Sequence, residues 1–118
     1  MFKGELSRFV QKIRDARGVV LIGLDGIPIE KISVDEHLNL EALAAEHVAL
    51  MKKSMIAGEE LGTGQIYEFS IFTNKIIMII RSVTPEYFVV VALSPNGNYG
   101  RVRFELRKLI PRLAEEIS

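Results

Sequence analysis

Apolar and polar residues recur along the chain at helical spacing, in alternation and in unbroken runs, and each pattern predicts one kind of element. At the start of the chain the spacing is helical, which predicts an amphipathic helix that ends near Gly18, a residue suited to a helix C-cap. The apolar positions of this first helix are Phe2, Leu6, Phe9, Val10 and Ile13.

The next segment, residues 18–32, predicts a β-hairpin. Residues 19–24 are apolar without alternation, which is typical of a strand covered on both faces. Asp25 and Gly26 follow, and an Asp-Gly pair between two apolar runs predicts a tight turn because both residues tolerate positive φ. Pro28 has no N–H to donate to a neighbouring strand, so we expect the second arm to lie at the edge of a sheet.

Residues 40–61 predict a long helix, which Asn39 caps at its N-terminus and a Gly-Thr-Gly segment ends. On a helical wheel, one side carries Leu40, Leu43, Ala44, His47, Leu50, Met51, Ser54 and Gly58. The opposite side carries Ala42, Ala45, Ala49 and Ile56, with Glu41, Glu46, Lys52 and Lys53 beside them. Small residues on an outer face allow a second helix to approach closely. Alanine is also the best helix former on a solvated face, so both interpretations stay open.

Three strands and a last helix follow the long helix. Turn residues separate segments at 65–73, 75–83 and 87–93, of which the first alternates and the other two contain continuous apolar runs typical of central strands. Asn98 can cap a final helix, and Pro111 should kink that helix because it removes a backbone donor.

These strand characters predict one topology. With strands numbered along the chain, the order 2-1-5-4-3 keeps the hairpin and the meander intact and puts the Pro28 strand and the 65–73 strand at the edges. Three helices then cover the two faces of one antiparallel sheet. We therefore expect a single α+β domain over residues 1–118, a profilin-like α/β/α sandwich with the first and last helices on one face and the long helix on the other.

The exposed edge strand at 65–73 predicts self-association. It is apolar, with little charge to prevent pairing with another strand. Pairing with the same strand of a second copy would cover it under two-fold symmetry and would bring two long helices side by side. The sequence therefore predicts a homodimer whose interface contains Tyr67, Phe69, Ile71, Ala42, Ala45 and Ala49.

Composition and motifs exclude several classes of function. Fifteen basic and fifteen acidic side chains cancel, which argues against nucleic-acid binding through net charge. The chain has no cysteine and no P-loop, and no residues form a recognisable nucleophile, base or metal set, so we expect no enzyme, cofactor or metal site. His47 is expected to be a hydrogen-bonded packing residue. Without a signal peptide or an apolar run of about 18 residues, we expect a cytoplasmic protein with no membrane insertion.

Basic residues gather on the first and last helices. They are Arg8, Lys12, Arg14, Arg101, Arg103, Arg107, Lys108 and Arg112, with Glu5, Asp15, Glu105 and Glu115 among them. A solvated surface of mixed charge and a docking site for an acidic partner are both compatible with this pattern. Phe104 points away from the apolar side of its helix, so it either packs against the first helix or marks a contact site.

Two motifs carry a family resemblance when their order and spacing are taken together. The first apolar strand runs into Asp25-Gly26-Ile27-Pro28-Ile29, and the last helix opens with Asn98-Tyr99-Gly100-Arg101-Val102-Arg103. A long alanine-rich helix and a three-strand meander lie between them. The chain resembles, over essentially its whole length, the roadblock/dynein light chain family of the longin-like class, and most of all its bacterial gliding-motility GTPase regulators.

The resemblance implies a non-catalytic homodimer that binds a small Ras-like GTPase as a regulator or scaffold, with stimulation of GTP hydrolysis as one mode of action. We expect partner-binding residues on the outer side of the long helix, at Glu46, Lys52, Lys53 and Ile56. The alternative function is a structural adaptor, in which the sheet edge or a groove captures a peptide of a motor or signalling protein.

Overall fold

The computed structural model describes residues 2–117, which form three helices and five strands. In chain order these are α1 (Phe2–Gln11), β1 (Ala16–Gly23), β2 (Pro28–Ser33), α2 (Leu40–Leu61), β3 (Glu68–Phe72), β4 (Ile77–Thr84), β5 (Tyr87–Leu93) and α3 (Tyr99–Ile117).

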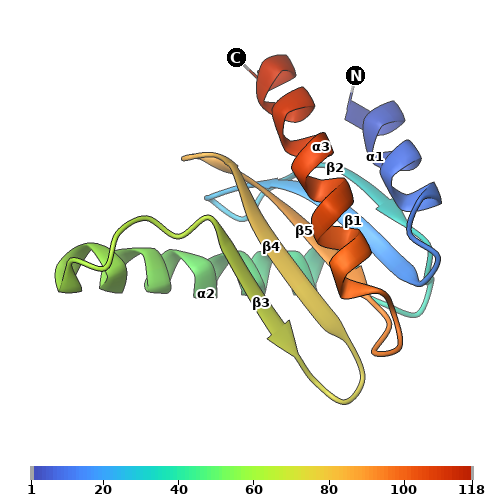
Figure 1. Ribbon diagram of the computed structural model, residues 1–118, viewed down its shortest axis with the longest axis horizontal. Coiled ribbons are helices and arrows are strands. Elements are labelled where there is room, and N and C mark those ends of the chain that lie inside the picture. Colours follow the sequence, from blue (N-terminus) through green and yellow to red (C-terminus); the bar gives the residue numbers. More distant parts are fainter. Residues whose placement is uncertain (1, 118) are drawn as a thin grey trace.

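The five strands form one antiparallel sheet in the order β2-β1-β5-β4-β3, as predicted (Figure 1). Val90 on the central strand β5 lies opposite Val20 on β1 and Ile80 on β4, and Ile80 lies opposite Phe69 on β3. β1, β5 and the first half of β4 are buried, whereas β2 and β3 are only partly covered. The continuous apolar runs therefore mark the centre of the sheet, and the interrupted segments mark its edges.

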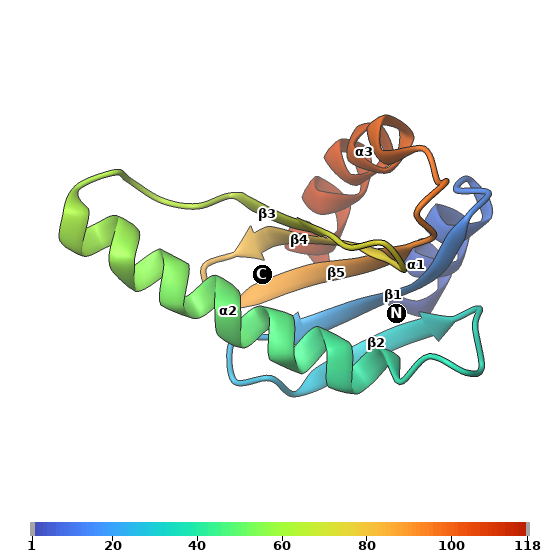
Figure 2. The ribbon, with the colours of Figure 1, turned by 90° about the horizontal axis from the view of Figure 1, so that it is seen from below.

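Helices cover both faces of the sheet, so the predicted α/β/α sandwich is confirmed. α1 and α3 lie on one face and α2 crosses the other (Figure 2). The core under α1 and α3 includes Leu6, Phe9, Val19, Leu21, Ile79, Val91, Leu106 and Leu113. The core under α2 includes Val20, Ile22, Ala44, Val48, Met51, Ile80, Phe88 and Val90.

The first helix is shorter than the sequence predicts. It ends at Gln11, and Gly18 lies in β1 rather than at a helix C-cap. A Cβ atom on Gly18 would lie 2.5 Å from Cδ2 of Leu40 and 2.9 Å from the carbonyl oxygen of Ile32. Gly18 therefore allows the first turn of α2 to lie close against the sheet. Glycine is needed here for a contact between distant segments, although the local sequence looks like the end of a helix.

The hairpin loop between β1 and β2 is longer than a two-residue turn. The N–H of Gly26 donates to the carbonyl of Gly23 at 2.9 Å, and the N–H of Gly23 donates to the carbonyl of Ile27 at 3.1 Å. Gly26 has a φ of 84°, whereas Asp25 does not share the positive φ that we expected. Asp25 instead accepts a hydrogen bond from the N–H of Ile27 at 3.0 Å through its side chain. The Asp-Gly pair still closes the hairpin, as part of a three-residue loop.

The buried side of α2 is rotated relative to the helical-wheel prediction. Val48 is buried in the core, whereas Leu50, predicted to face inward, is 44% exposed. Apolar residues occur around most of this helix, so the wheel has no clear polar side from which to fix the rotation. Both predicted ends of the helix are confirmed: the Asn39 side chain accepts from the N–H of Ala42, and Gly62 ends the helix with a φ of 70°.

Candidate protein interface

The free edge of the sheet at β3 is the first part of the candidate interface. Within residues 2–117, no strand pairs with the outer edge of β3, whose inner edge pairs with β4. β3 begins at Glu68, so Tyr67 lies just before the strand and is 66% exposed. Phe69 and Ile71 are half-buried and pack against the core on the α2 side. The predicted interface residues of this segment therefore lie together at one edge.

The opposite side of β3 contacts α3 and is more polar than the apolar edge strand that the sequence predicts. Glu68 forms ion pairs with Arg103 at 2.8 Å and Arg81 at 3.4 Å. The Ser70 hydroxyl lies 2.9 Å from the hydroxyl of Tyr99, whose ring meets Phe72 edge-on at a centroid distance of 5.0 Å. These contacts fix the α3 side of the strand, so the α2 side is the more open one for a partner.

The outer side of α2 is the second part of the candidate interface. Ala42 and Ala49 are exposed there, as predicted, together with Ile56 at 50% exposure. Ala45 is instead half-buried and packs against the core beneath the helix. Leu50 takes its place among the exposed apolar residues, because the helix is rotated from the predicted orientation. Two of the three predicted alanines are therefore free to contact another helix.

The last turns of α2 extend beyond the sheet, and residues 62–67 return beside them to β3 (Figures 1 and 2). This projecting segment, residues 52–67, carries Leu61, which at 78% is more exposed than the other large apolar side chains of the described chain. Leu61 is absent from the predicted interface because it falls at the helix end. Its exposure arises from the projection of α2, which a helical wheel does not represent.

A groove lies between the projecting segment and the sheet. Its volume is about 830 Å³, within the range of ligand and peptide sites. The lining includes Met55, Ile56, Ile66, Tyr67, Val83 and Pro85, with Lys52 and Glu59 among the polar residues. Of the predicted partner-binding residues, Lys52 and Ile56 line the groove, whereas Glu46 and Lys53 are exposed elsewhere on α2.

The turn after α2 is closely packed. The N–H of Thr63 donates to the carbonyl of Gly58 at 2.9 Å, and a Cβ atom on Gly58 would lie 2.8 Å from the carbonyl oxygen of Gly64. Gly64 has a φ of 97°, which favours glycine. These contacts fold the return segment back on the helix and define the shape of the groove.

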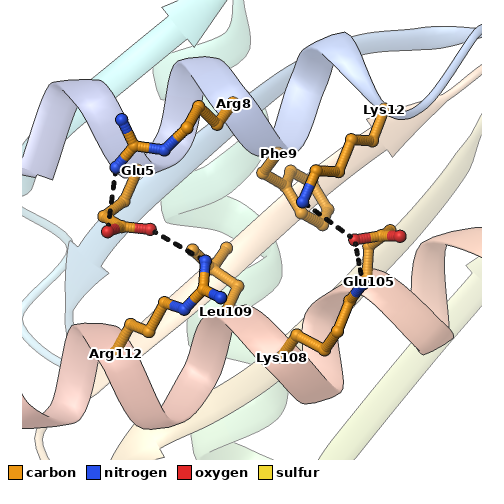
Figure 3. A pocket seen from close by; sticks show the side chains of 8 residues that line it. All are labelled: Glu5, Arg8, Phe9, Lys12, Glu105, Lys108, Leu109 and Arg112. Atoms are coloured by element: carbon orange, nitrogen blue, oxygen red, sulfur yellow. Dashed lines mark ion pairs between the residues drawn. The ribbon is translucent and has the colours of Figure 1, made fainter.

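A second polar cluster lies between α1 and α3, on the other face of the molecule (Figure 3). Glu5 forms ion pairs with Arg8 at 2.9 Å and Arg112 at 3.6 Å. The sequence indicates that glutamates lie among these basic residues, but not that Glu105 is buried. Its side chain is 3% exposed and lies 3.4 to 3.7 Å from three cations, those of Lys12, Arg101 and Lys108.

Nδ1 of His47 lies 2.7 Å from the carbonyl oxygen of Leu43, so this histidine is a hydrogen-bonded packing residue, as expected. No group of three or more potential metal ligands comes together within residues 2–117. None of the helices in that range is both long and apolar enough to cross a bilayer.

Comparison with solved structures identifies the family. MglC from Myxococcus xanthus is 32% identical, with 98% of each chain covered and a TM-score of 0.70. MglB from the same organism is 16% identical, with 98% of this chain and 86% of MglB covered and a TM-score of 0.88. A Roadblock/LC7 domain from Streptomyces avermitilis is 16% identical, with 97% and 95% covered and a TM-score of 0.86. The chain therefore belongs to the Roadblock/LC7 domain family.

Comparison with family models and with curated protein sequences finds no match. The family assignment depends on the MglC sequence identity together with the shared fold. Another neighbour of the same fold, MglB from Thermus thermophilus, is a gliding protein.

Proposed function

We propose that this protein is a non-catalytic homodimer that binds a small Ras-like GTPase and regulates it. Family membership and the gliding-motility neighbours support the regulatory role. The observation that carries the dimer is the open edge of β3 beside the projecting end of α2. Both features expose apolar side chains, among them Ile56, Leu61 and Tyr67, and both lie at the same edge of the sheet, so a second copy can cover them together.

Two-fold symmetry determines how the copies would meet. Antiparallel pairing of β3 with its partner continues the sheet, and it requires a two-fold axis perpendicular to the sheet. The α2 helices then lie on the same face of the joined sheet. Because the end of each α2 projects beyond β3, it would extend over the sheet of the other copy and cover the half-buried Phe69 and Ile71. This packing would also bury Leu61.

The GTPase would bind to the α2 side of this dimer, where Glu46, Lys52 and Lys53 are exposed, whereas Ile56 would lie in the dimer interface with Leu61. The dimer would act by repositioning the switch segments of the GTPase, which carries its own catalytic groups. Stimulated hydrolysis and simple scaffolding are two outcomes of the same contact.

Nucleotide-dependent retention tests the GTPase part of the proposal. The protein is immobilised and incubated with each small Ras-like GTPase of its own genome, loaded with GDP or with a non-hydrolysable GTP analogue. We expect one GTPase to be retained in one nucleotide state, and Lys53→Glu to weaken this retention. Lys75→Glu, at an exposed position in the β3–β4 turn, is the matched control. Equal retention in both states, or none, would refute GTPase regulation and leave the dimer unaffected. Phosphate release then separates stimulation from scaffolding.

The groove supports a second candidate, a peptide adaptor. An extended peptide could pair with the open edge of β3 and place side chains in the adjoining groove. Retention of extended peptides from a library, without retention of any GTPase, would favour this function.

A further inference from the structure

The exposed surface of α1 and α3 carries more positive than negative charge. Five cationic side chains surround only two carboxylates, which leaves three positive charges in excess; the cations are Arg8, Lys12, Arg101, Lys108 and Arg112. Each of these side chains is between 42% and 59% exposed. We call this set the α1–α3 basic surface.

The two carboxylates hold the cations in place. Figure 3 shows Glu5 between Arg8 and Arg112, and Glu105 between Lys12 and Lys108. Glu105 is buried in the seam between the helices, whereas the cations around it are partly exposed, so its negative charge lies beneath theirs. A partner therefore meets positive charge on side chains that are already partly ordered, which lowers the entropy lost on binding.

An exposed aromatic ring lies beside one of these cations. Phe104 is 50% exposed, and Nζ of Lys108 lies 4.8 Å from its ring centroid. The sequence is compatible with Phe104 either packing against α1 or marking a contact site; its exposure agrees better with a contact site. Aromatic side chains are enriched at protein interfaces, and a few well-placed anchors carry most of the binding energy there.

We propose that the α1–α3 basic surface docks an acidic surface of a partner protein, with Phe104 as its apolar contact. Duplex DNA and anionic membranes present nearly uniform negative charge and favour an uninterrupted field of cations. Here the cations are few, they are held in two groups around Glu5 and Glu105, and an exposed apolar ring lies beside one of them, which fits the discrete charges and apolar patches of a protein. The seam between the helices has room for about 10 Å³ only, so the partner lies on the surface rather than in a groove.

This surface is separate from the proposed dimer interface. It lies on the opposite face of the sheet from α2 (Figure 2), so it stays exposed when two copies pair through β3. The perpendicular two-fold axis of that pairing would place both basic surfaces on the same side of the dimer. A partner with two acidic segments would then bind through both, with a higher apparent affinity than through one. Docking to a single copy does not depend on the dimer or on the GTPase.

Charge variants of opposite sign test the docking surface. The probe is a fluorescent peptide of repeated Glu-Glu-Leu-Glu, followed by anisotropy at low ionic strength, where exposed charges are screened least. We expect Lys108→Gln with Arg112→Gln to weaken binding roughly fivefold, since the double substitution removes two exposed cations and each exposed ion pair contributes only modestly. Glu5→Gln should strengthen binding, because it removes a negative charge between two arginines. A general loss of structure would not produce this opposite pair of effects.

The matched control is Lys53→Gln with Lys75→Gln, which changes the net charge equally but lies outside the basic surface. Its affinity for the peptide should stay within about twofold of the original. Phe104→Ala should weaken peptide binding without changing its dependence on salt. Duplex DNA and phosphatidylserine vesicles are the competing probes. Binding to either of them but not to the peptide, no binding at all, or equal weakening in the control would overturn the proposal.

Discussion

The hydroxyl of Ser70 on β3 lies 2.9 Å from the hydroxyl of Tyr99 at the start of α3, and it joins an edge strand to a helix that begins 27 residues after the strand ends. Both side chains are partly buried, so the hydrogen bond is shielded from competing water.

Tyr99→Phe should lower the free energy of unfolding by about 1 kcal/mol, because it removes this hydrogen bond and keeps the ring contact with Phe72. Ser70→Ala should have a similar effect, and the double variant should cost less than the sum of the two. Chemical denaturation of the four proteins measures the coupling. Strict additivity would show that the two hydroxyls do not bond to each other.

Gly18→Ala should destabilise the protein by about 1 to 3 kcal/mol, because the added methyl group would contact Leu40 and the carbonyl of Ile32. Gly100→Ala is the matched control, since its nearest neighbour, an oxygen of Asn98, lies at an ordinary 3.5 Å. Gly100 is in the first turn of α3, where alanine should be neutral or stabilising by up to about 1 kcal/mol. Thermal unfolding compares the two. An unchanged melting temperature in Gly18→Ala would contradict the close approach of α2 to β1.

Leu61→Glu with Ile56→Glu should convert the proposed dimer to a monomer that remains folded. Both side chains are exposed in the single copy, so a charge there costs little until the interface forms. Val34→Glu, at a 56% exposed position beyond the opposite edge strand, should remain dimeric. Light scattering after size-exclusion chromatography gives the mass of each. If the Leu61 and Ile56 variant stays dimeric, the interface lies elsewhere.

Glu105→Gln should destabilise the protein by about 1 kcal/mol at low ionic strength, because three nearby cations lose their shared counter-charge. The loss should shrink in concentrated salt, which screens the repulsion among the partly exposed cations. Denaturation at low and high salt measures the difference. Glu116→Gln removes an exposed charge from the same helix and serves as the control. A destabilisation that does not depend on salt would indicate a packing effect instead.

The sequence predicts the sheet order because two local features constrain it. Pro28 excludes the second strand from the centre, and the apolar runs in β4 and β5 exclude those strands from the edges. Properties that depend on contacts between distant segments are harder to predict. Gly18 resembles a helix end locally, but its role is to make room for Leu40 on α2. The burial of Glu105 also depends on how α1 packs against α3, which the sequence does not show.

The exposure of the candidate interface residues was predicted in part. Tyr67, Ala42, Ala49 and Ile56 are exposed as expected, because edge position and helical period determine them locally. Ala45 is half-buried and Leu50 is exposed, the reverse of the helical-wheel prediction. Because α2 has apolar residues on most sides, its rotation is determined by packing against the sheet and not by its own pattern. The exposure of Leu61 depends on how far α2 projects beyond the sheet, which is a property of the whole fold.

The close packing of Gly58 against Gly64 affects how quickly a partner could bind. Because the turn after α2 is already folded back and hydrogen-bonded, the projecting segment needs no ordering step before it meets another surface. Association would then be limited by diffusion and orientation, and not by folding of a loop. A side chain at position 58 would push the return segment away from α2. The projecting segment would then have to change its conformation each time a partner binds.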